Sequence, residues 1–363
     1  MLLEVRHVTQ YHYAAPVRES LMEVWMQPQK GARQRLVSFD LEIDPATQLF
    51  SYADTFGNAV YHFDVPQPHE RLTIVARSAV ETQPDIPLPE ALDMGEWDRL
   101  RSDFVQGDQF DFLREHGFAI QTDLLRAFAA EHEIERLRAR DPLSAVRALA
   151  GIIYESFAYE TGVTEADSPI DEALRERRGV CQDFSHIMLA ICRSWGIPAR
   201  YVSGYLFTDR EGGDRSDPDA THAWVEVFLP SLRWVGFDPT NNVLAGERHI
   251  AAAIGRDYSD VPPSRGVYKG DAESQLAVGV SVRRARTALT EPEFLKVSQP
   301  NFSRNARRRP PLGGPLHDQQ QQQTAAAAAV SRLSRAAPRP RCGGGCEPAA
   351  GPARRSAASA PGR

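Results

Sequence analysis

One cysteine stands directly after a glycine and a valine in the stretch RRGVCQDFSH, residues 177–186. Apolar residues follow it at helical spacing, namely Phe184, Met188, Ile191 and Trp195. This spacing, closed by Gly196 and Pro198, predicts a mostly buried helix with Cys181 in its first turn. Backbone N–H groups and the dipole at a helix N-terminus stabilise a thiolate, the reactive form of cysteine. Cys181 is therefore a candidate nucleophile, with a structural core cysteine as the alternative.

A thiol nucleophile needs a proton acceptor, and two strand-like motifs downstream offer one. HAWVEVFL begins with His222, RWVGFD ends with Asp238, and the short loop between the two motifs predicts a β-hairpin. If Phe228 pairs with Leu232, His222 lies opposite Asp238, and a register change of two residues leaves both on one face. An aspartate beside a histidine fixes its tautomer and stabilises the imidazolium. We expect a general base and its orienting residue, with a structural hydrogen bond as the alternative.

A zinc site is the competing interpretation of the same residues. Cys181, His186, His222 and Asp238 are all chemically suitable ligands. Zinc sites built from loops usually contain close ligand pairs such as CxxC, and the close pair here is Cys181 with His186. Five residues correspond to about 140° around a helix, so these two side chains point to different faces. We therefore predict no metal and no other cofactor.

The elements that position these residues follow from the periodicity of the chain. Apolar and polar residues alternate up to about position 80, as in Val37, Phe39, Leu41 and Ile43, which predicts antiparallel strands with YADTFGN as a turn. Beyond the proline-rich TQPDIPLPE the period becomes helical, and Asp141 followed by Pro142 predicts a helix start. The predicted organisation is a β-rich domain at 1–81, a connector at 82–98, a catalytic domain at 99–296 and a low-complexity tail at 297–363.

Composition restricts the function classes. The chain has 363 residues and a net charge of −6, but the segment from Val297 onward carries +9, which leaves −15 for the first 296 residues. An acidic body argues against nucleic acid as the main partner. No apolar run approaches the roughly 20 residues that span a bilayer, and the first residues do not resemble a secretory signal. We expect a cytoplasmic location and no membrane partner.

The other cysteines fit this picture. Four cysteines are too few for a disulfide framework in a chain of this length. Cys192 lies about 16 Å along the predicted helix from Cys181, too far for a disulfide. Cys342 and Cys346 form a lone CxxxC in the tail, whose Gln, Ala, Arg, Pro and Gly composition predicts disorder.

Three separated motifs carry a family likeness. GVCQDFSHIMLAICRSWGIPARYVSGYL, HAWVEVFLPSLRWVGFDPTNN and GRDYSDVPPSRGVYKG resemble the bacterial transglutaminase-like proteins, and TQYHYAAPV and YADTFGNAV resemble their β-rich N-terminal domain. The resemblance covers roughly residues 1–290. It implies an α+β, papain-like core in which a helix carrying the cysteine packs on an antiparallel sheet. It also implies Cys181 as nucleophile, His222 as base and Asp238 as orienting residue of a cysteine-dependent acyl-transfer enzyme acting on a peptide or amide.

Further residues are candidates for substrate contact. Trp224 shares the strand face of His222, and Gln182 and Asp183 follow Cys181, where Asp183 can instead complement the helix dipole. Four others lie within motifs that resemble the family, with ordinary packing or loop structure as the equal alternative: Tyr205, Arg256, Asp257 and Tyr258. The reaction is expected to be hydrolysis rather than transamidation, and a non-catalytic binding module on the same fold is the alternative function. The sequence does not define an oligomeric state.

Overall fold

The computed structural model describes residues 1–208, 214–217 and 220–285, so the predicted tail with Cys342 and Cys346 lies outside the described residues. The N-terminal part consists of strands joined by turns. These strands are β1 (Leu2–Val17), β2 (Ser20–Val24), β3 (Gln34–Asp44), β4 (Phe50–Ala53), β5 (Ala59–Val65) and β6 (His69–Thr82). They form parts of two four-stranded antiparallel sheets, ordered β15-β1-β6-β3 and β14-β2-β5-β4.

Alternating burial explains these sheets. Along β3 the polar residues Ser38 and Asp40 are more exposed than the apolar residues Phe39 and Ile43 between and beyond them, as the period-two pattern predicted. Apolar side chains from both sheets meet in one buried cluster that includes Val24, Phe63 and Ile74. Packing of the inward faces of two sheets is what this alternation requires.

Two late strands complete these sheets and correct the expected boundary. β15 (Ser274–Arg284) pairs antiparallel with β1, and β14 (Ser264–Tyr268) pairs with β2. The sequence analysis grouped both strands with the catalytic segment 99–296, but their backbone hydrogen bonds join them to the first strands of the chain. Pairing between residues about 240 to 280 positions apart leaves no local signal, because it depends on how distant parts of the chain meet in the folded protein.

The middle of the chain supplies helices around a five-stranded sheet. The helices are α1 (Glu96–Leu100), α2 (Asp103–Asp108), α3 (Asp123–Glu131), α4 (Pro142–Ser156), α5 (Ile170–Glu176) and α6 (Cys181–Ser194), with 3₁₀ turns at Phe110–Phe112, Ile134–Ala139 and Tyr258–Asp260. The sheet is ordered β12-β11-β10-β9-β13, and its members are β9 (Ala199–Leu206), β10 (His222–Leu229), β11 (Arg233–Asp238), β12 (Val243–Leu244) and β13 (His249–Gly255). A separate two-stranded parallel ladder pairs β7 (Ala158–Tyr159) with β8 (Arg178–Gly179).

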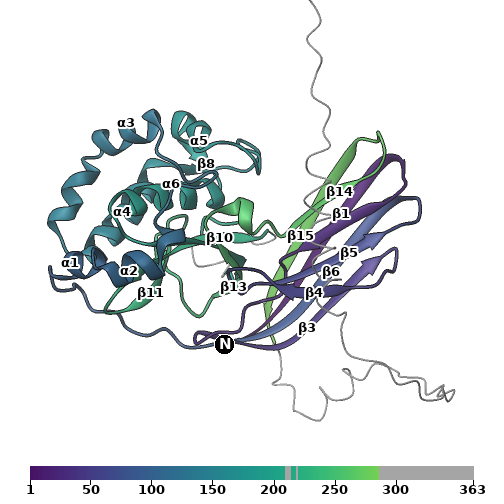
Figure 1. Cartoon of the computed structure of the whole chain (residues 1–363), viewed down its shortest axis with the longest axis horizontal. Coiled ribbons are helices and arrows are strands. Elements are labelled where there is room, and N and C mark those ends of the chain that lie inside the picture. The colour runs from purple at the N-terminus through teal and green to yellow at the C-terminus, as the bar shows by residue number, and fades with distance from the viewer. Residues whose placement is uncertain (209–213, 218–219, 286–363) are drawn as a thin grey trace, which may run out of the picture. The chain divides into compact units, whose positions relative to one another are not determined.

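The helices cover one face of the five-stranded sheet. α6 packs on β9 and β10, and α4 packs on α6 and β11, an arrangement that can be followed in Figure 1. Apolar residues at helical spacing along α4, including Val146 and Leu149, are buried in the resulting core together with Phe184 and Met188 of α6. The predicted α+β class is confirmed, with a helix that begins at the cysteine packed on an antiparallel sheet.

The helix ends follow from local chemistry. The Asp141 side chain accepts a hydrogen bond from the Ser144 N–H at 3.2 Å, and Pro142 occupies the first turn of α4, as predicted. α6 ends before Gly196, whose φ of +76° belongs to the left-handed region that glycine adopts without strain. Among the described residues, none of the helices combines the length and the apolar character needed to cross a membrane.

Candidate active site

Cys181 is the first residue of α6, so the position predicted for the thiol is the one observed. Val180 precedes the helix and provides no side-chain cap, so its side chain does not use the N–H groups of the first turn. The thiol is partly exposed, whereas Cys192 on the same helix is fully buried, and both cysteines are free. Burial raises the pKa of Cys192 to about 12. The two thiols therefore differ strongly in accessibility, and burial keeps Cys192 protonated at neutral pH.

His222, the first residue of β10, contacts both Cys181 and Asp238. Its Nε2 lies 2.8 Å from Asp238 Oδ2, and both side chains are almost completely buried. The Cys181 sulfur lies close enough to the imidazole to raise the pKa of His222. Because an ionised carboxylate only accepts hydrogen bonds, Nε2 carries the proton and Nδ1 of the neutral ring is left to accept one. Nδ1 is therefore the nitrogen that can take the proton of the thiol.

The hairpin brings these residues together with a register two positions from the expected one. Phe228 pairs with Trp234 rather than with Leu232. The displacement by two residues keeps His222 and Asp238 on the same face, because side chains alternate with a period of two. The structure therefore brings the three predicted residues together, with His222 hydrogen-bonded to Asp238 and close to the Cys181 sulfur.

The electrostatics of this set follow from burial and pairing. Burial alone lowers the pKa of His222, but the neighbouring Asp238 carboxylate and the Cys181 sulfur raise it to about 10. Burial alone raises the pKa of Asp238, but His222 and His249 hold it well below its usual range. The Asp238 carboxylate therefore favours the protonated form of His222, and an imidazolium beside the sulfur is the partner that a thiolate nucleophile needs.

The sequence analysis missed three polar residues that surround this set. His249 Nε2 lies 3.3 Å from Asp238 Oδ2, and its Nδ1 accepts the N–H of Gly246. Asn241 Nδ2 donates to Asp238 Oδ2 at 2.7 Å, and Ser216 Oγ lies 3.3 Å from His222 Nδ1. The one local signal was Asn241 in DPTNN, which closely follows Asp238 in a turn where the N–H groups of Thr240 and Asn241 both donate to Asp238 Oδ1. His249 and Ser216 gave none.

His222, Asp238 and His249 also have the composition of a metal site, since one ligand atom of each lies within 4.8 Å of the others. The hydrogen bonds favour a different role. His249 Nδ1 accepts a backbone N–H, so the proton of the neutral ring is on the Nε2 that faces Asp238. The Nε2 of His222 likewise meets Asp238 at a hydrogen-bond distance. The N–H groups of His222 and His249 therefore both point at Asp238 Oδ2. They position the side chains, and the nitrogens that face the carboxylate carry protons and are not free to bind a metal.

Gln182 and Asp183 bind the protein rather than projecting freely into a cleft. Gln182 Nε2 donates to Ala166 O, and Asp183 Oδ2 accepts from the Val180 N–H and the Thr164 hydroxyl. Burial raises the pKa of the Asp183 carboxyl. Both side chains hold the loop before α5 against the start of α6, which agrees with the structural alternative for Asp183.

Trp224 lies beside the catalytic candidates. Its ring is stacked near that of His222, with centroids 6.2 Å apart, and meets the His249 ring edge to face. The side chain is 2% exposed, and its indole Nε1 is among the buried polar atoms that have no hydrogen-bond partner. Trp224 therefore packs against the rings of His222 and His249. Its contact with a substrate stays a prediction.

The other candidates have hydrogen-bond or ion-pair partners outside the set of Cys181, His222 and Asp238. Tyr205 is 2% exposed, and its hydroxyl meets His7 Nδ1 at 3.1 Å in the contact between β1 and β9. Arg256 forms an ion pair with Asp260. The Tyr258 N–H donates to His186 Nε2, which places His186 in a separate cluster from Cys181, as its helical position predicted.

Asp257 has a structural environment. The carboxylate is fully buried and lies 2.7 Å from His116 Nδ1. It also accepts hydrogen bonds from the N–H and the hydroxyl of Ser259. These bonds join the loop around residue 116 to the turn that follows β13.

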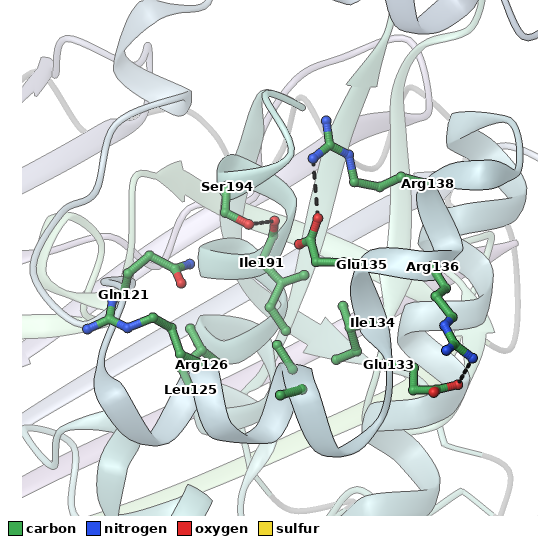
Figure 2. A pocket seen from close by; sticks show the side chains of 12 residues that line it. Gln121, Leu125, Arg126, Glu133, Ile134, Glu135, Arg136, Arg138, Ile191 and Ser194 are labelled. Carbon is green, nitrogen blue, oxygen red and sulfur yellow. Dashed lines mark hydrogen bonds and ion pairs between the residues drawn. The ribbon is translucent and has the colours of Figure 1, made fainter.

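A pocket of about 490 Å³ lies at the opposite end of α6 from Cys181 (Figure 2). Its charged side chains are all paired: Arg138 with Glu135 and Arg136 with Glu133 within the lining, and Arg126 with Asp123 outside it. Ser194, at the end of α6, donates to Ile191 O. About 13 residues of helix, or roughly 20 Å, separate this pocket from Cys181, so it is not the site of the thiol chemistry.

The fold and the site define a transglutaminase-like protein with a papain-like arrangement of cysteine, histidine and aspartate. A family model of the transglutaminase-like superfamily matches residues 133–239, and one of the bacterial transglutaminase-like N-terminal region matches residues 3–81. An uncharacterized protein of Mycobacterium tuberculosis is 38% identical over 291 residues, which cover 77% of this chain and 91% of that protein. The chain belongs to the transglutaminase-like superfamily, whose members are typically cysteine-dependent enzymes.

Two further relatives bear on the fold and the chemistry. The crystal structure of a candidate cysteine protease from Cytophaga hutchinsonii has a TM-score of 0.62 and 21% identity, and the match covers 80% of this chain and 92% of that chain. This likeness shows the fold. A protein-glutamine gamma-glutamyltransferase of Pseudomonas aeruginosa is 31% identical over 161 residues, which cover 40% of this chain and 23% of that protein.

Proposed function

We propose that the protein is a cysteine-dependent acyl-transfer enzyme that cleaves an amide or peptide bond through a thioester on Cys181. The observation that carries the proposal is the position of His222, which lies beside the thiol and, through Nε2, meets the buried Asp238 at 2.8 Å. A histidine held in this way can take a proton at Nδ1 and return it at the same nitrogen. A histidine with a purely structural role would not need both a cysteine thiol and a buried carboxylate as neighbours.

The reaction follows from these positions. His222 removes the thiol proton, and Cys181 attacks the carbonyl carbon of the substrate. The developing oxyanion accepts a hydrogen bond from the Cys181 N–H at the start of α6. His222 then protonates the leaving amine, and the acyl group stays on sulfur as a thioester. Water, deprotonated by His222, attacks the thioester and releases the acid and the free thiol.

We favour water over an amine as the acceptor. Water reaches any thioester that is open to solvent, whereas transamidation requires a site that binds an amine and excludes water. The partial likeness to the glutamyltransferase of Pseudomonas aeruginosa keeps transamidation as the second candidate. A non-catalytic binding module is the alternative from another class, and the complete set of Cys181, His222 and Asp238 argues against it.

The test supplies the protein with a mixed amide and peptide library, with and without a primary amine, and follows the products by mass spectrometry. Hydrolysis products that disappear in Cys181→Ala support the proposal. Amine adducts in excess of acids would change the assignment to a transamidase. Absence of both products, with Cys181 still reactive toward iodoacetamide, would favour the binding module.

A further inference from the structure

Asn241 closes a ring of hydrogen bonds through the imidazole of His222. Its Nδ2 donates to Ser216 Oγ at 2.8 Å and to Asp238 Oδ2 at 2.7 Å. Ser216 Oγ in turn lies 3.3 Å from His222 Nδ1, and Asp238 Oδ2 lies 2.8 Å from His222 Nε2. One amide nitrogen therefore holds the hydrogen-bond partners of both ring nitrogens.

The orientation of this amide follows from its neighbours. Asn241 Oδ1 accepts hydrogen bonds from the N–H groups of Arg215 and Ser216, at 2.8 and 3.4 Å. Oδ1 thus faces two donors and Nδ2 faces two acceptors. The reversed amide would place Oδ1 against the carboxylate and Nδ2 against two N–H groups, so the contacts select a single orientation.

The same contacts attach a loop segment to the site. Residues 214–217 carry Ser216 over His222. Arg215 in this segment donates to the backbone oxygens of Tyr154 and Phe157 near the end of α4. Asp214 forms an ion pair with Arg248, just before β13. The segment is therefore fixed to two other elements, and its hydroxyl has a defined place relative to the imidazole.

We propose that Asn241 is a positioning residue that fixes the imidazole plane of His222 from both sides, through Asp238 at Nε2 and Ser216 at Nδ1. The inference rests on the proposed function, since it assigns a role within the same proton transfer. Ser216 Oγ accepts the hydrogen bond of Asn241 and has a second lone pair for the protonated Nδ1, while the lone pair of the neutral Nδ1 is left for the thiol proton. When Nδ1 takes the thiol proton, the Ser216 oxygen accepts a hydrogen bond from the imidazolium. No bond other than these hydrogen bonds changes.

A closed ring of hydrogen bonds predicts a mutational result that independent hydrogen bonds would not give. Loss of either Asn241 or Ser216 opens the ring and leaves the imidazole held by Asp238 alone, so that Nδ1 is less firmly positioned against the sulfur. Loss of the second residue adds little to what the first has already released. The effects of the two substitutions should therefore be strongly non-additive, as expected for residues that act as a unit.

The experiment measures the rate of Cys181 alkylation by iodoacetamide between pH 4 and 10, with peptide mapping, in the full chain. The variants are Asn241→Ala, Ser216→Ala and their double variant. Asn242→Gly is the matched control, because Asn242 is exposed and its φ of 53° suits glycine. This readout needs no knowledge of the substrate. Melting temperature is recorded for each protein, and Ser216→Ala provides the second route if Asn241→Ala does not fold.

In Asn241→Ala we expect alkylation at pH 7 to slow by about tenfold, the effect of losing hydrogen bonds to a charged group, and the rise in rate to move to higher pH. Ser216→Ala should show a smaller loss, and the double variant should react no more slowly than Asn241→Ala. Unchanged rates, or losses that multiply in the double variant, would overturn the inference. Slow alkylation of Cys181 in the unmodified protein would instead contradict the proposed function.

Discussion

Asp238→Asn is the substitution that tests most of the site in one step. The amide has the same size as the carboxylate but no charge, and it presents N–H as well as oxygen to His222. If the N–H faces Nε2, the proton of the neutral imidazole moves to Nδ1, which can then no longer accept the thiol proton. The substitution therefore removes a counter-ion and favours the wrong tautomer.

The expected loss of turnover in Asp238→Asn follows from the ion pair between His222 and Asp238. The pKa of His222 is raised from 6.5 to about 10, even though burial alone would lower it. Such a rise corresponds to roughly 3–5 kcal/mol of preferential stabilisation of the imidazolium. Converted to a rate, this free energy predicts a fall in turnover of roughly 10²- to 10⁴-fold at pH 7. The thiol should also alkylate more slowly, because the thiolate loses its stable counter-ion.

The assay compares the turnover and the alkylation of Cys181 in the variant and in a matched control. Asp257→Asn is that control, since Asp257 is a fully buried carboxylate that binds another histidine, His116, at 2.7 Å. We expect the control to lose stability while the folded protein keeps its reactivity. Equal reactivity of Asp238→Asn and the unmodified protein would refute the reasoning, as would an equal loss of reactivity in both variants.

Three further predictions follow from the same geometry. Iodoacetamide at pH 7.5 should label Cys181 at least a hundredfold faster than Cys192, whose pKa is raised by burial to about 12; equal labelling, measured by peptide mapping, would contradict the assigned roles. Because the pKa of His222 is raised when the protein folds, its stabilising effect should be complete below about pH 6.5 and lost as the pH rises toward 10. Urea titrations should accordingly show the difference in unfolding free energy between the unmodified protein and His222→Gln shrinking over that range, and a growing difference would show the opposite sign. Treatment with EDTA should leave activity and melting temperature unchanged, and a stoichiometric metal that tracks activity in elemental analysis would replace the thiolate mechanism.

The parts of the site that depend on local sequence pattern could be predicted from the sequence. Helical spacing after Cys181 placed the thiol at a helix start, because a buried face repeats every three to four residues. The short hairpin loop placed His222 near Asp238 even with the register displaced by two residues, because such a displacement preserves the face. These inferences needed only elements that are adjacent along the chain.

The remaining partners depend on contacts between distant segments. His249 reaches Asp238 from β13, and Ser216 reaches His222 from a segment held by side-chain bonds rather than by regular structure. Tyr205 is the opposite case. Its motif made it a candidate for substrate contact, but its side chain packs against His7 of β1. The pairing of β14 and β15 with the first strands was hidden for the same reason. Such contacts form between segments that meet only in the folded protein, and the hydrophobic periodicity of the sequence does not predict them.

The most direct test of the central claim is to trap the acyl-enzyme. The protein is mixed rapidly with a reactive amide or ester substrate, quenched in acid, digested and mapped by mass spectrometry. We predict one acyl group per chain on the peptide that contains Cys181, removed by hydroxylamine as a thioester and missing in Cys181→Ala, with strongly reduced formation in His222→Ala. Turnover with no acyl group on Cys181, or with the acyl group on another residue, would contradict the account.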